Sequence, residues 1–315
     1  MPRLIDIQGH RGARALFPEN TLEGFLAAAA LGVKAFELDV AMTADGVVVV
    51  SHDPALNPDI TRDASGVWLS RKGPTIHTLT HAALRDYDVG RIRPGSRTAF
   101  LFPDQTPLDG SRIPTLAGVL AALPDACFTI EVKTNPEHPG WTATPRVLTD
   151  ATLSVIDAAK AAPRIILESF DWRVQRHVRR SRPDIKLAWL TSATAIRDAA
   201  LWWDSATPTQ SYQSALDLTG MRAGLAGGGA RNQDSDTGRR KRRLVSVPAS
   251  VAAEGGPIWA PDHTSLTEPQ IQEAHALGLL VLPWTVNQPA DMGRLIAWGV
   301  DGLISDRPDL ALKLV

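Results

Sequence analysis

One cysteine, Cys127, is present among the 315 residues of this chain, and long apolar runs are absent. A single cysteine excludes an internal disulfide, so the cysteine content gives no sign of an oxidising compartment. Because Cys127 falls in an apolar run that predicts a strand, we expect it to lie in the core. The alanine-rich stretch 27–33 is too short to cross a bilayer.

A secretory signal is lacking as well. Asp6 interrupts the first apolar run after two residues, so the start of the chain does not contain the hydrophobic region of such a signal. We therefore expect a cytoplasmic protein without stable membrane association. The sequence does not indicate an oligomeric state.

The chain has no excess of charge of one sign. It carries 33 Lys and Arg against 34 Asp and Glu, a net charge of −1, which gives no electrostatic case for binding nucleic acid or a membrane surface. The basic run 239–243 is not accompanied by an aromatic or groove-reading element. Together with glycines 227–229 it predicts a mobile, solvated loop near 224–243, with contact to a phospholipid-like substrate surface as the alternative.

Strand and helix patterns alternate along the chain, which favours a parallel α/β fold. The predicted strands are residues 4–8, 35–40, 127–132, 164–168, 185–190, 257–260, 279–283 and 301–304. The predicted helices lie near 21–31, 114–122, 145–161, 171–180, 194–203, 267–277, 289–297 and 307–314. Residues 53–113 and about 204–255 break this alternation, and we expect both to be insertions.

Residues that can carry chemistry gather near the start of the chain. His10 follows the first predicted strand, and Asn20 or Thr21 can cap the helix that begins at Leu22. A strand, a helix and a second strand form a βαβ unit, whose functional side chains gather at the carboxyl ends of the strands. His10 fits that edge.

Two acids lie two residues apart in the second predicted strand. Glu37 and Asp39 leave the same face of a strand, and two adjacent buried carboxylates repel each other unless a cation joins them. Oxygen ligands favour Mg²⁺ or Ca²⁺. The turn sequence 43–46 and the β-branched run 47–50 then predict a tight reversal that brings His52 near Asp39.

The same spacing recurs at the end of the run 127–132. Glu131 and Lys133 are two residues apart and should share a face of that strand. They supply a third carboxylate for a metal and an ammonium group suited to a phosphate oxygen.

Taken in order, these motifs resemble the glycerophosphodiester phosphodiesterase family. The matching segments are HRG at 10–12, PENT at 18–21, ExD at 37–39, HD at 52–53, ExK at 131–133, SFD at 169–171, WTVN at 284–287 and the segment 299–308. The resemblance covers both ends of the chain and most of its middle, but not residues about 200–255.

The resemblance implies a (β/α)₈ TIM barrel, expected as a single domain over 1–315, that cleaves glycerophosphodiesters to glycerol 3-phosphate and an alcohol. Members of the family are thought to use the neighbouring glycerol hydroxyl as nucleophile, which gives a cyclic phosphate that water then opens. Insertion 53–113 would overhang the site. By matching position, the resemblance implies that His10 and His52 are the acid–base pair and that Glu37, Asp39 and Glu131 bind Mg²⁺ or Ca²⁺. It also implies that Arg11 and Lys133 bind the phosphate and that Phe170 and Trp284 pack against the glycerol.

Other interpretations remain. Asn20 can have no role beyond capping a helix, or Trp284 can simply fill the barrel core, and Asp301 and Asp306 are expected to organise the last strand and the start of the last helix. A lysophospholipase D or a phosphoinositide-cleaving phospholipase on the same scaffold is an alternative function, and it requires an apolar trough for an acyl chain. A noncatalytic binding protein is disfavoured, because every polar residue that the chemistry needs is present. The sequence leaves open which histidine is the base.

Overall fold

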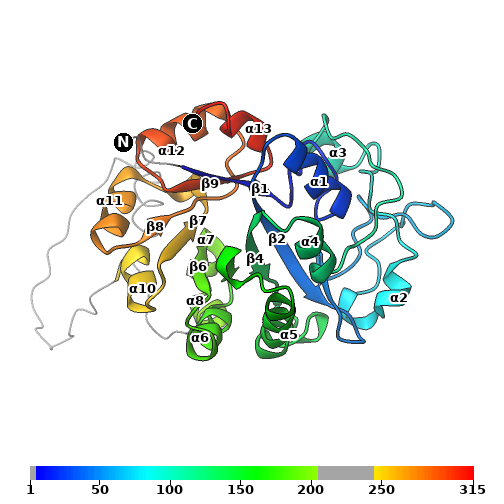
Figure 1. The fold of residues 1–315 in the computed structure, drawn as a ribbon, viewed down its shortest axis with the longest axis horizontal. Coiled ribbons are helices and arrows are strands. Elements are labelled where there is room, and N and C mark those ends of the chain that lie inside the picture. Colours follow the sequence, from blue (N-terminus) through cyan, green and yellow to red (C-terminus); the bar gives the residue numbers. More distant parts are fainter. Residues whose placement is uncertain (1–4, 205–244) are drawn as a thin grey trace, which may run out of the picture.

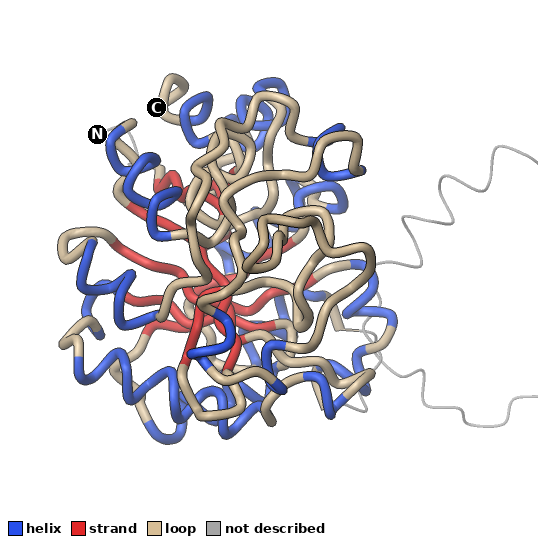
Figure 2. Tube along the Cα trace, turned by 90° about the vertical axis from the view of Figure 1, so that its right-hand side faces the viewer, coloured by secondary structure: helices blue, strands red, loops and turns tan. Residues whose placement is uncertain are grey.

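A computed structural model describes residues 5–204 and 245–315 and places eight parallel strands in a nearly closed barrel surrounded by helices (Figure 1). This confirms the predicted TIM barrel. The predicted mobile loop near 224–243 lies outside the described residues. In Figure 2 the strands occupy the centre of the molecule, and helices cover them from outside.

Each predicted strand has a counterpart whose ends lie within two residues of the prediction. The strands are β1 Asp6–His10, β2 Ala35–Met42, β3 Val48–Val50, β4 Cys127–Val132, β5 Ile165–Ser169, β6 Lys186–Thr191, β7 Ile258–Pro261, β8 Leu280–Val281 and β9 Gly302–Ser305. Their order is β8-β7-β6-β5-β4-β2-β1-β9, with β3 antiparallel to β2. Between β8 and β9, the backbone N–H groups of Asp301 and Ile304 donate to the carbonyl oxygens of Val281 and Pro283 at 2.9 and 3.0 Å, which bridges the remaining gap.

The helices follow the predicted alternation, apart from one helix that is divided and three short helices within the insertions that were not predicted. They are α1 Leu22–Ala30, α2 His81–Leu84, α3 Arg97–Leu101, α4 Leu116–Ala122, α5 Pro145–Ala158, α6 Trp172–Ser181, α7 Ala193–Arg197, α8 Ala199–Trp202, α10 Val247–Ala253, α11 Glu268–Ala276, α12 Pro289–Ala297 and α13 Pro308–Ala311. The helix predicted at 194–203 is divided at Asp198, whose φ of −104° and ψ of 36° are not helical. Helix α10 was not predicted, because it lies in a stretch without clear periodicity.

The position of Cys127 also differs from the prediction. It is the first residue of β4 and its side chain is exposed. The core begins with the next residue, Phe128, which packs against Phe25 and Phe36 from α1 and β2. The apolar run was correctly predicted to be a strand, but its first residue lies at the amino end of that strand and outside the core.

The outward faces of the strands form the main core with the helices. Residues that alternate along β2, β4 and β5, such as Leu38, Ile130 and Leu167, are fully buried against this layer. Their neighbours along each strand point into the barrel. The interior has an apolar half, formed mainly by Ala188, Leu190, Ile258, Ala260, Leu282 and Ile304. The other half, on β1, β2, β4 and β5, is polar and carries Gln8, His10, Glu37, Asp39, Thr129, Glu131 and Glu168.

The predicted reversal after β2 is confirmed. Val40 pairs with Val50 in the antiparallel β2–β3 hairpin, and the N–H of Ser51 donates to the carbonyl of Asp39 at 2.9 Å. His52, the residue before insertion 53–113, is therefore placed close to Asp39.

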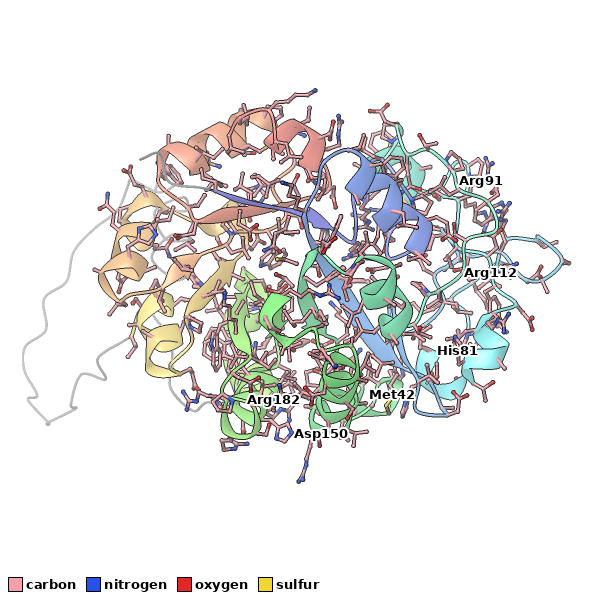
Figure 3. The ribbon with its side chains drawn as sticks, in the orientation of Figure 1. Met42, His81, Arg91, Arg112, Asp150 and Arg182 are labelled. Carbon is pink, nitrogen blue, oxygen red and sulfur yellow. The ribbon has the colours of Figure 1, made fainter. Side chains whose placement is uncertain are left out.

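Insertion 53–113 contains little regular structure and builds a small core of its own. Leu56, Ile76 and Leu84 pack against Ala41 and Val49 of the hairpin. In Figure 1 this insertion lies to one side of the barrel, and in Figure 3 the labelled His81, Arg91 and Arg112 lie within it. Among residues 5–204 and 245–315, we find no helix that is both long enough and apolar enough to span a membrane.

Candidate active site

The polar half of the barrel brings the predicted site residues together at the carboxyl ends of its strands. His10, the last residue of β1, pairs in register with Glu37 of β2. Asp39 of β2 pairs with Glu131 of β4. Parallel pairing thus converts residues distant in sequence into neighbours on one inner wall.

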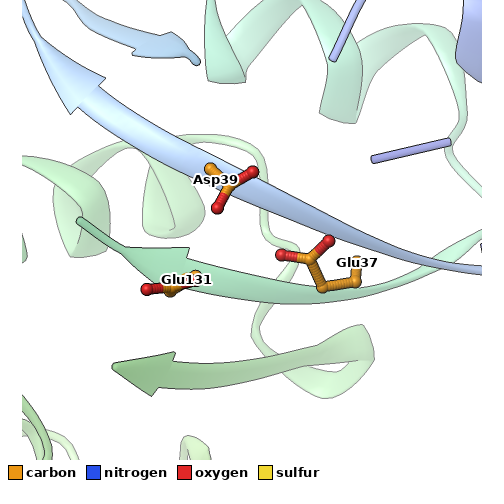
Figure 4. Close-up of side chains that lie close together, drawn as sticks. All are labelled: Glu37, Asp39 and Glu131. Carbon is orange, nitrogen blue, oxygen red and sulfur yellow. The ribbon is translucent and has the colours of Figure 1, made fainter. Parts of the chain in front are cut away.

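Glu37, Asp39 and Glu131 form an acidic trio (Figure 4). One carboxylate oxygen from each residue lies within 4.8 Å of the others, and the residues are 3 %, 1 % and 7 % exposed. Burial, together with the charges of Asp39 and Glu168, raises the pKa of Glu37 well above its usual range. Burial also raises the pKa of Glu131, to about 7, although Lys133 opposes the shift.

Two cations partly balance the acidic trio. The Lys133 ammonium lies 3.0 Å from Glu131 Oε1 and 3.6 Å from Asp39 Oδ1. The Arg11 guanidinium lies 3.2 Å from Asp39 Oδ2 and donates to Glu19 Oε1 at 2.9 Å. Burial alone would raise the pKa of Asp39, but the charges of Arg11 and Lys133 lower it, so this carboxyl group is ionised.

A tight turn after β1 positions Arg11. Its φ of 50° lies in the left-handed region, and its N–H donates to Glu37 Oε2 at 3.1 Å. At Gly9 a Cβ atom would lie 1.8 Å from the carbonyl oxygen of Gly12, so the turn requires glycine there. Left-handed backbone at a residue with a side chain costs about 1–3 kcal/mol, and such conformations cluster at functional sites.

Asn20 forms a hydrogen bond with the acidic trio and does not cap helix α1. Its Nδ2 donates to Asp39 Oδ2 at 2.9 Å, and its φ is 55°. Thr21 is the residue that caps α1, where its Oγ1 accepts the N–H of Gly24 at 3.0 Å. The cap interpretation of Asn20 is therefore wrong, and Asn20 belongs to the site.

His10 is held by an acid from the far end of the chain. Its Nδ1 lies 2.5 Å from Asp306 Oδ1, and its Nε2 lies 3.7 Å from Glu37 Oε2. Burial opposes ionisation of Asp306, but interaction with His10 lowers its pKa, so the carboxylate is ionised and accepts a hydrogen bond from Nδ1–H. Asn287 donates to the other Asp306 oxygen at 2.7 Å. The expected structural role of Asp306 was incomplete, because this side chain orients His10.

His52 is arranged in the same way. Its Nδ1 lies 2.8 Å from Asp53 Oδ1, and Asn57 donates to Asp53 Oδ2 at 2.8 Å. Burial and the neighbouring Arg11 and Lys133 charges lower the pKa of His52 to about 4. At neutral pH this imidazole is therefore neutral and its Nε2 can accept a proton.

An aromatic pair lies beside Lys133. The rings of Phe170 and Trp284 are 5.4 Å apart in an edge-to-face contact, and the Lys133 ammonium lies 6.0 Å from the Phe170 ring centre. Trp202, which was not predicted to belong to the site, packs edge-to-face against Phe170 with a distance of 6.2 Å between the ring centres. The structure thus brings all nine predicted site residues to one end of the barrel, while their roles remain predictions.

Several residues of the site were not assigned to it from the sequence, among them Glu19, Asn20, Glu168 and Asp306. Glu19 and Asn20 lie in the PENT segment, and Asp306 lies in the segment 299–308, so the motifs contained a signal that was interpreted as structural. Glu168 ends an apolar run as a single acid, a pattern that also fits a solvated strand end.

Buried acids and cations at the carboxyl ends of the strands, with two imidazoles held by aspartates, define a barrel enzyme that handles an anionic substrate. Comparison with known proteins makes this class specific. Residues 10–310 match the glycerophosphoryl diester phosphodiesterase family, and the chain belongs to that family. The resemblance found in the sequence and the expected enzyme class are both confirmed.

Similar proteins cover almost the whole chain. The Mycobacterium tuberculosis protein named "Probable glycerophosphodiester phosphodiesterase 2" is 29 % identical over 96 % of this chain and 87 % of its own length. The crystal structure of a candidate glycerophosphoryl diester phosphodiesterase from Silicibacter pomeroyi has a TM-score of 0.79 and 32 % identity, covering 100 % of this chain and 94 % of that one. An Oleispira antarctica phosphodiesterase, in complex with the product sn-glycerol-3-phosphate, has a TM-score of 0.66 and 18 % identity, covering 99 % and 96 %.

Proposed function

We propose that this protein hydrolyses glycerophosphodiesters to glycerol 3-phosphate and an alcohol, with a divalent cation and two histidines. The observation that carries the proposal is the acidic trio Glu37, Asp39 and Glu131 beside Lys133 and between two aspartate-held imidazoles. Relatives named for this activity, and the Oleispira antarctica neighbour with bound sn-glycerol-3-phosphate, support it.

The acidic trio fits a hard divalent cation. Three buried carboxylates offer oxygen ligands within reach of a common ion, and Asp39 Oδ1 is buried without a hydrogen-bond partner. When bound, Mg²⁺ or Ca²⁺ would supply positive charge that stabilises the nonbridging phosphate oxygens as the ester bond is attacked. Both ions accept three carboxylates together with water.

Lys133 and Arg11 would hold the phosphate. A phosphodiester carries one negative charge that grows on its nonbridging oxygens in the transition state, so fixed cations lower the barrier. Lys133 is 18 % exposed at its side chain, and opposite charges on Glu131 and Asp39 raise its pKa although burial opposes this. It therefore stays charged at neutral pH.

The two histidines would move the protons. His52, with a pKa of about 4, starts neutral and would accept the proton of the neighbouring glycerol hydroxyl as its oxygen attacks phosphorus. His10 would give its Nε2 proton to the leaving alkoxide. Water then opens the cyclic phosphate, with His10 taking a proton from the water and His52 returning one to the glycerol oxygen. Each transfer would contribute roughly 10² to 10⁴ in rate.

The histidine assignment is tested with His10→Ala and His52→Ala on glycerophosphocholine. Each should lower kcat by roughly 10² to 10⁴, while His177→Ala, which removes a surface histidine paired with Asp150 on α6 and α5, should leave it unchanged. Near wild-type turnover by either site variant would refute the acid–base roles.

The same enzyme preparation discriminates the substrate class. Release of glycerol 3-phosphate from glycerophosphocholine, lost in EDTA and restored by Mg²⁺ or Ca²⁺, is the expected result. Turnover restricted to lysophosphatidylcholine would instead identify a lysophospholipase D, and turnover of neither substrate would identify a binding protein.

A further inference from the structure

Helix α3, in insertion 53–113, carries two exposed apolar side chains that the proposed reaction does not use. Among the large apolar side chains of the described residues, Phe100 is the most exposed, at 85 %, and the next residue, Leu101, is 55 % exposed. We call these two residues the apolar tip. Apolar surface left in water is unfavourable, so a second surface that covers the tip would gain free energy.

The rest of α3 is fastened to the insertion. Ser96 caps the helix, since its Oγ accepts the N–H of Ala99 at 3.1 Å. The buried Thr98 donates from its hydroxyl to Asp59 Oδ2 at 2.8 Å. Thr98 therefore faces the insertion, and Phe100, two positions further along, lies on the opposite side of the helix. The exposure of the tip thus follows from how the helix is anchored.

Helix α3 lies at the same end of the barrel as the candidate active site. The segment just after it contacts the segment that follows His10, because Gln105 Nε2 donates to the carbonyl oxygen of Arg14 at 2.7 Å. Leu101 also lines a cavity of about 400 Å³ together with Asn287, from the loop after β8. A surface that covers the tip would therefore face the active-site end of the molecule.

The surroundings of the tip are cationic. Residues 91–103 contain three arginines and no acid. Asp109 pairs with Arg91, and Arg93 donates to a backbone carbonyl. Arg97, the first residue of α3, is exposed and pairs with no acid in the described part of the chain. An exposed cation beside exposed apolar side chains complements an anionic lipid surface.

The size of the tip favours a lipid surface over a protein partner. Stable protein interfaces bury roughly 1,200–2,000 Å² with a matching shape on both sides, and two protruding side chains do not offer this. A bilayer interface accepts such side chains without a preformed pocket. Because the net charge of the whole chain is only −1, the contact would be local and reversible.

We propose that the apolar tip and Arg97 dock this protein reversibly on anionic phospholipid bilayers. Phe100 and Leu101 insert among the lipid head groups, and Arg97 lies beside a lipid phosphate. Docking turns the active-site end of the barrel toward the membrane. The contact is separate from the catalytic groups, so it does not depend on turnover.

Sedimentation with vesicles of equal parts phosphatidylcholine and phosphatidylglycerol tests the proposal. The wild type should bind, and Phe100→Ser should lower the partition coefficient about tenfold or more, because it removes a large apolar side chain from the interface. Arg97→Gln should lower it about fivefold at low salt, and less at high salt. Leu277→Ser is the matched control. Leu277 is 44 % exposed but precedes β8, at the opposite end of the barrel, so its replacement should change binding less than about twofold.

The single cysteine provides a second readout. Cys127 is exposed at the amino end of β4, away from the tip. In a variant with Phe100→Cys and Cys127→Ser, an environment-sensitive fluorophore at position 100 should shift its emission to the blue when vesicles are added. The same fluorophore on Cys127 of the wild type should not shift.

Absence of vesicle binding by the wild type, equal binding by Phe100→Ser, or an equal blue shift at both labelled positions would overturn the proposal. Self-association of the wild type that Phe100→Ser abolishes would overturn it too, because the tip would then contact a second copy of the chain. Phe100→Ser should hydrolyse soluble glycerophosphocholine at the wild-type rate. A protein that docks as expected but hydrolyses no diester would refute the proposed function and leave this inference standing.

Discussion

The interaction of Asp306 with His10 provides a quantitative test of the site. Asp306 joins β9 to β1 through a 2.5 Å contact with His10 Nδ1, and its second oxygen accepts from Asn287. In Asp306→Asn the amide has one acceptor oxygen for two donors, so either the imidazole or Asn287 loses its partner.

The expected effect follows from the hydrogen bond that is lost. A hydrogen bond to a charged group is worth about 1.5–3 kcal/mol, and since each 1.36 kcal/mol is a factor of ten in rate, kcat should fall about 10- to 150-fold. Because Asp306 orients His10 without being assigned a substrate contact, KM should change less than about threefold.

Steady-state kinetics on glycerophosphocholine measures both constants. Asp309→Asn is the control, because Asp309 lies three residues further on and pairs with Arg307 instead. A variant Asp306→Asn with wild-type kcat would refute the claim that Asp306 orients His10, and a change confined to KM would place its role in binding.

Three further predictions concern the acidic trio. A saturating divalent cation, at about 100 times its dissociation constant, should add about 2.7 kcal/mol to the free energy of unfolding of the wild type. In urea titrations, Glu131→Gln should remove most of this gain. An equal gain in the variant would exclude Glu131 as a ligand. Since burial, opposed by Lys133, raises the pKa of Glu131 to about 7, the proton competes with the cation below that pH. Calorimetry should show weaker Mg²⁺ or Ca²⁺ binding at pH 6 than at pH 8, and equal affinity would contradict this. Asn20→Ala removes the donor to Asp39 and should lower the metal-free free energy of unfolding by about 1.5–3 kcal/mol; an unchanged urea midpoint would show that this bond contributes nothing.

Local patterns in the sequence predicted most of the barrel. The strand around Glu37 and Asp39 and the strand that ends in Glu131 were recognisable from short apolar runs, and parallel pairing places them side by side. The β-branched run 48–50 predicted the hairpin that delivers His52. These features depend on spacing along one strand, which a sequence shows directly.

The residues that were misinterpreted depend on contacts that spacing does not show. Asp306 lies 296 positions from His10, and only closure of the barrel through β9 and β1 brings them together. Glu168 is a lone acid in its strand, and its burial follows from the neighbours on β4 and β6. Cys127 was expected in the core because the end of a barrel strand looks the same in sequence as its middle.

The most direct test of the account is ³¹P NMR of the wild-type protein with glycerophosphocholine. With Mg²⁺ or Ca²⁺ we expect the diester resonance to be replaced by that of glycerol 3-phosphate, and EDTA to stop the conversion. Formation of phosphocholine instead, or undiminished conversion in EDTA, would contradict the proposal that the acidic trio and two histidines cleave the bond to the alcohol with a bound cation.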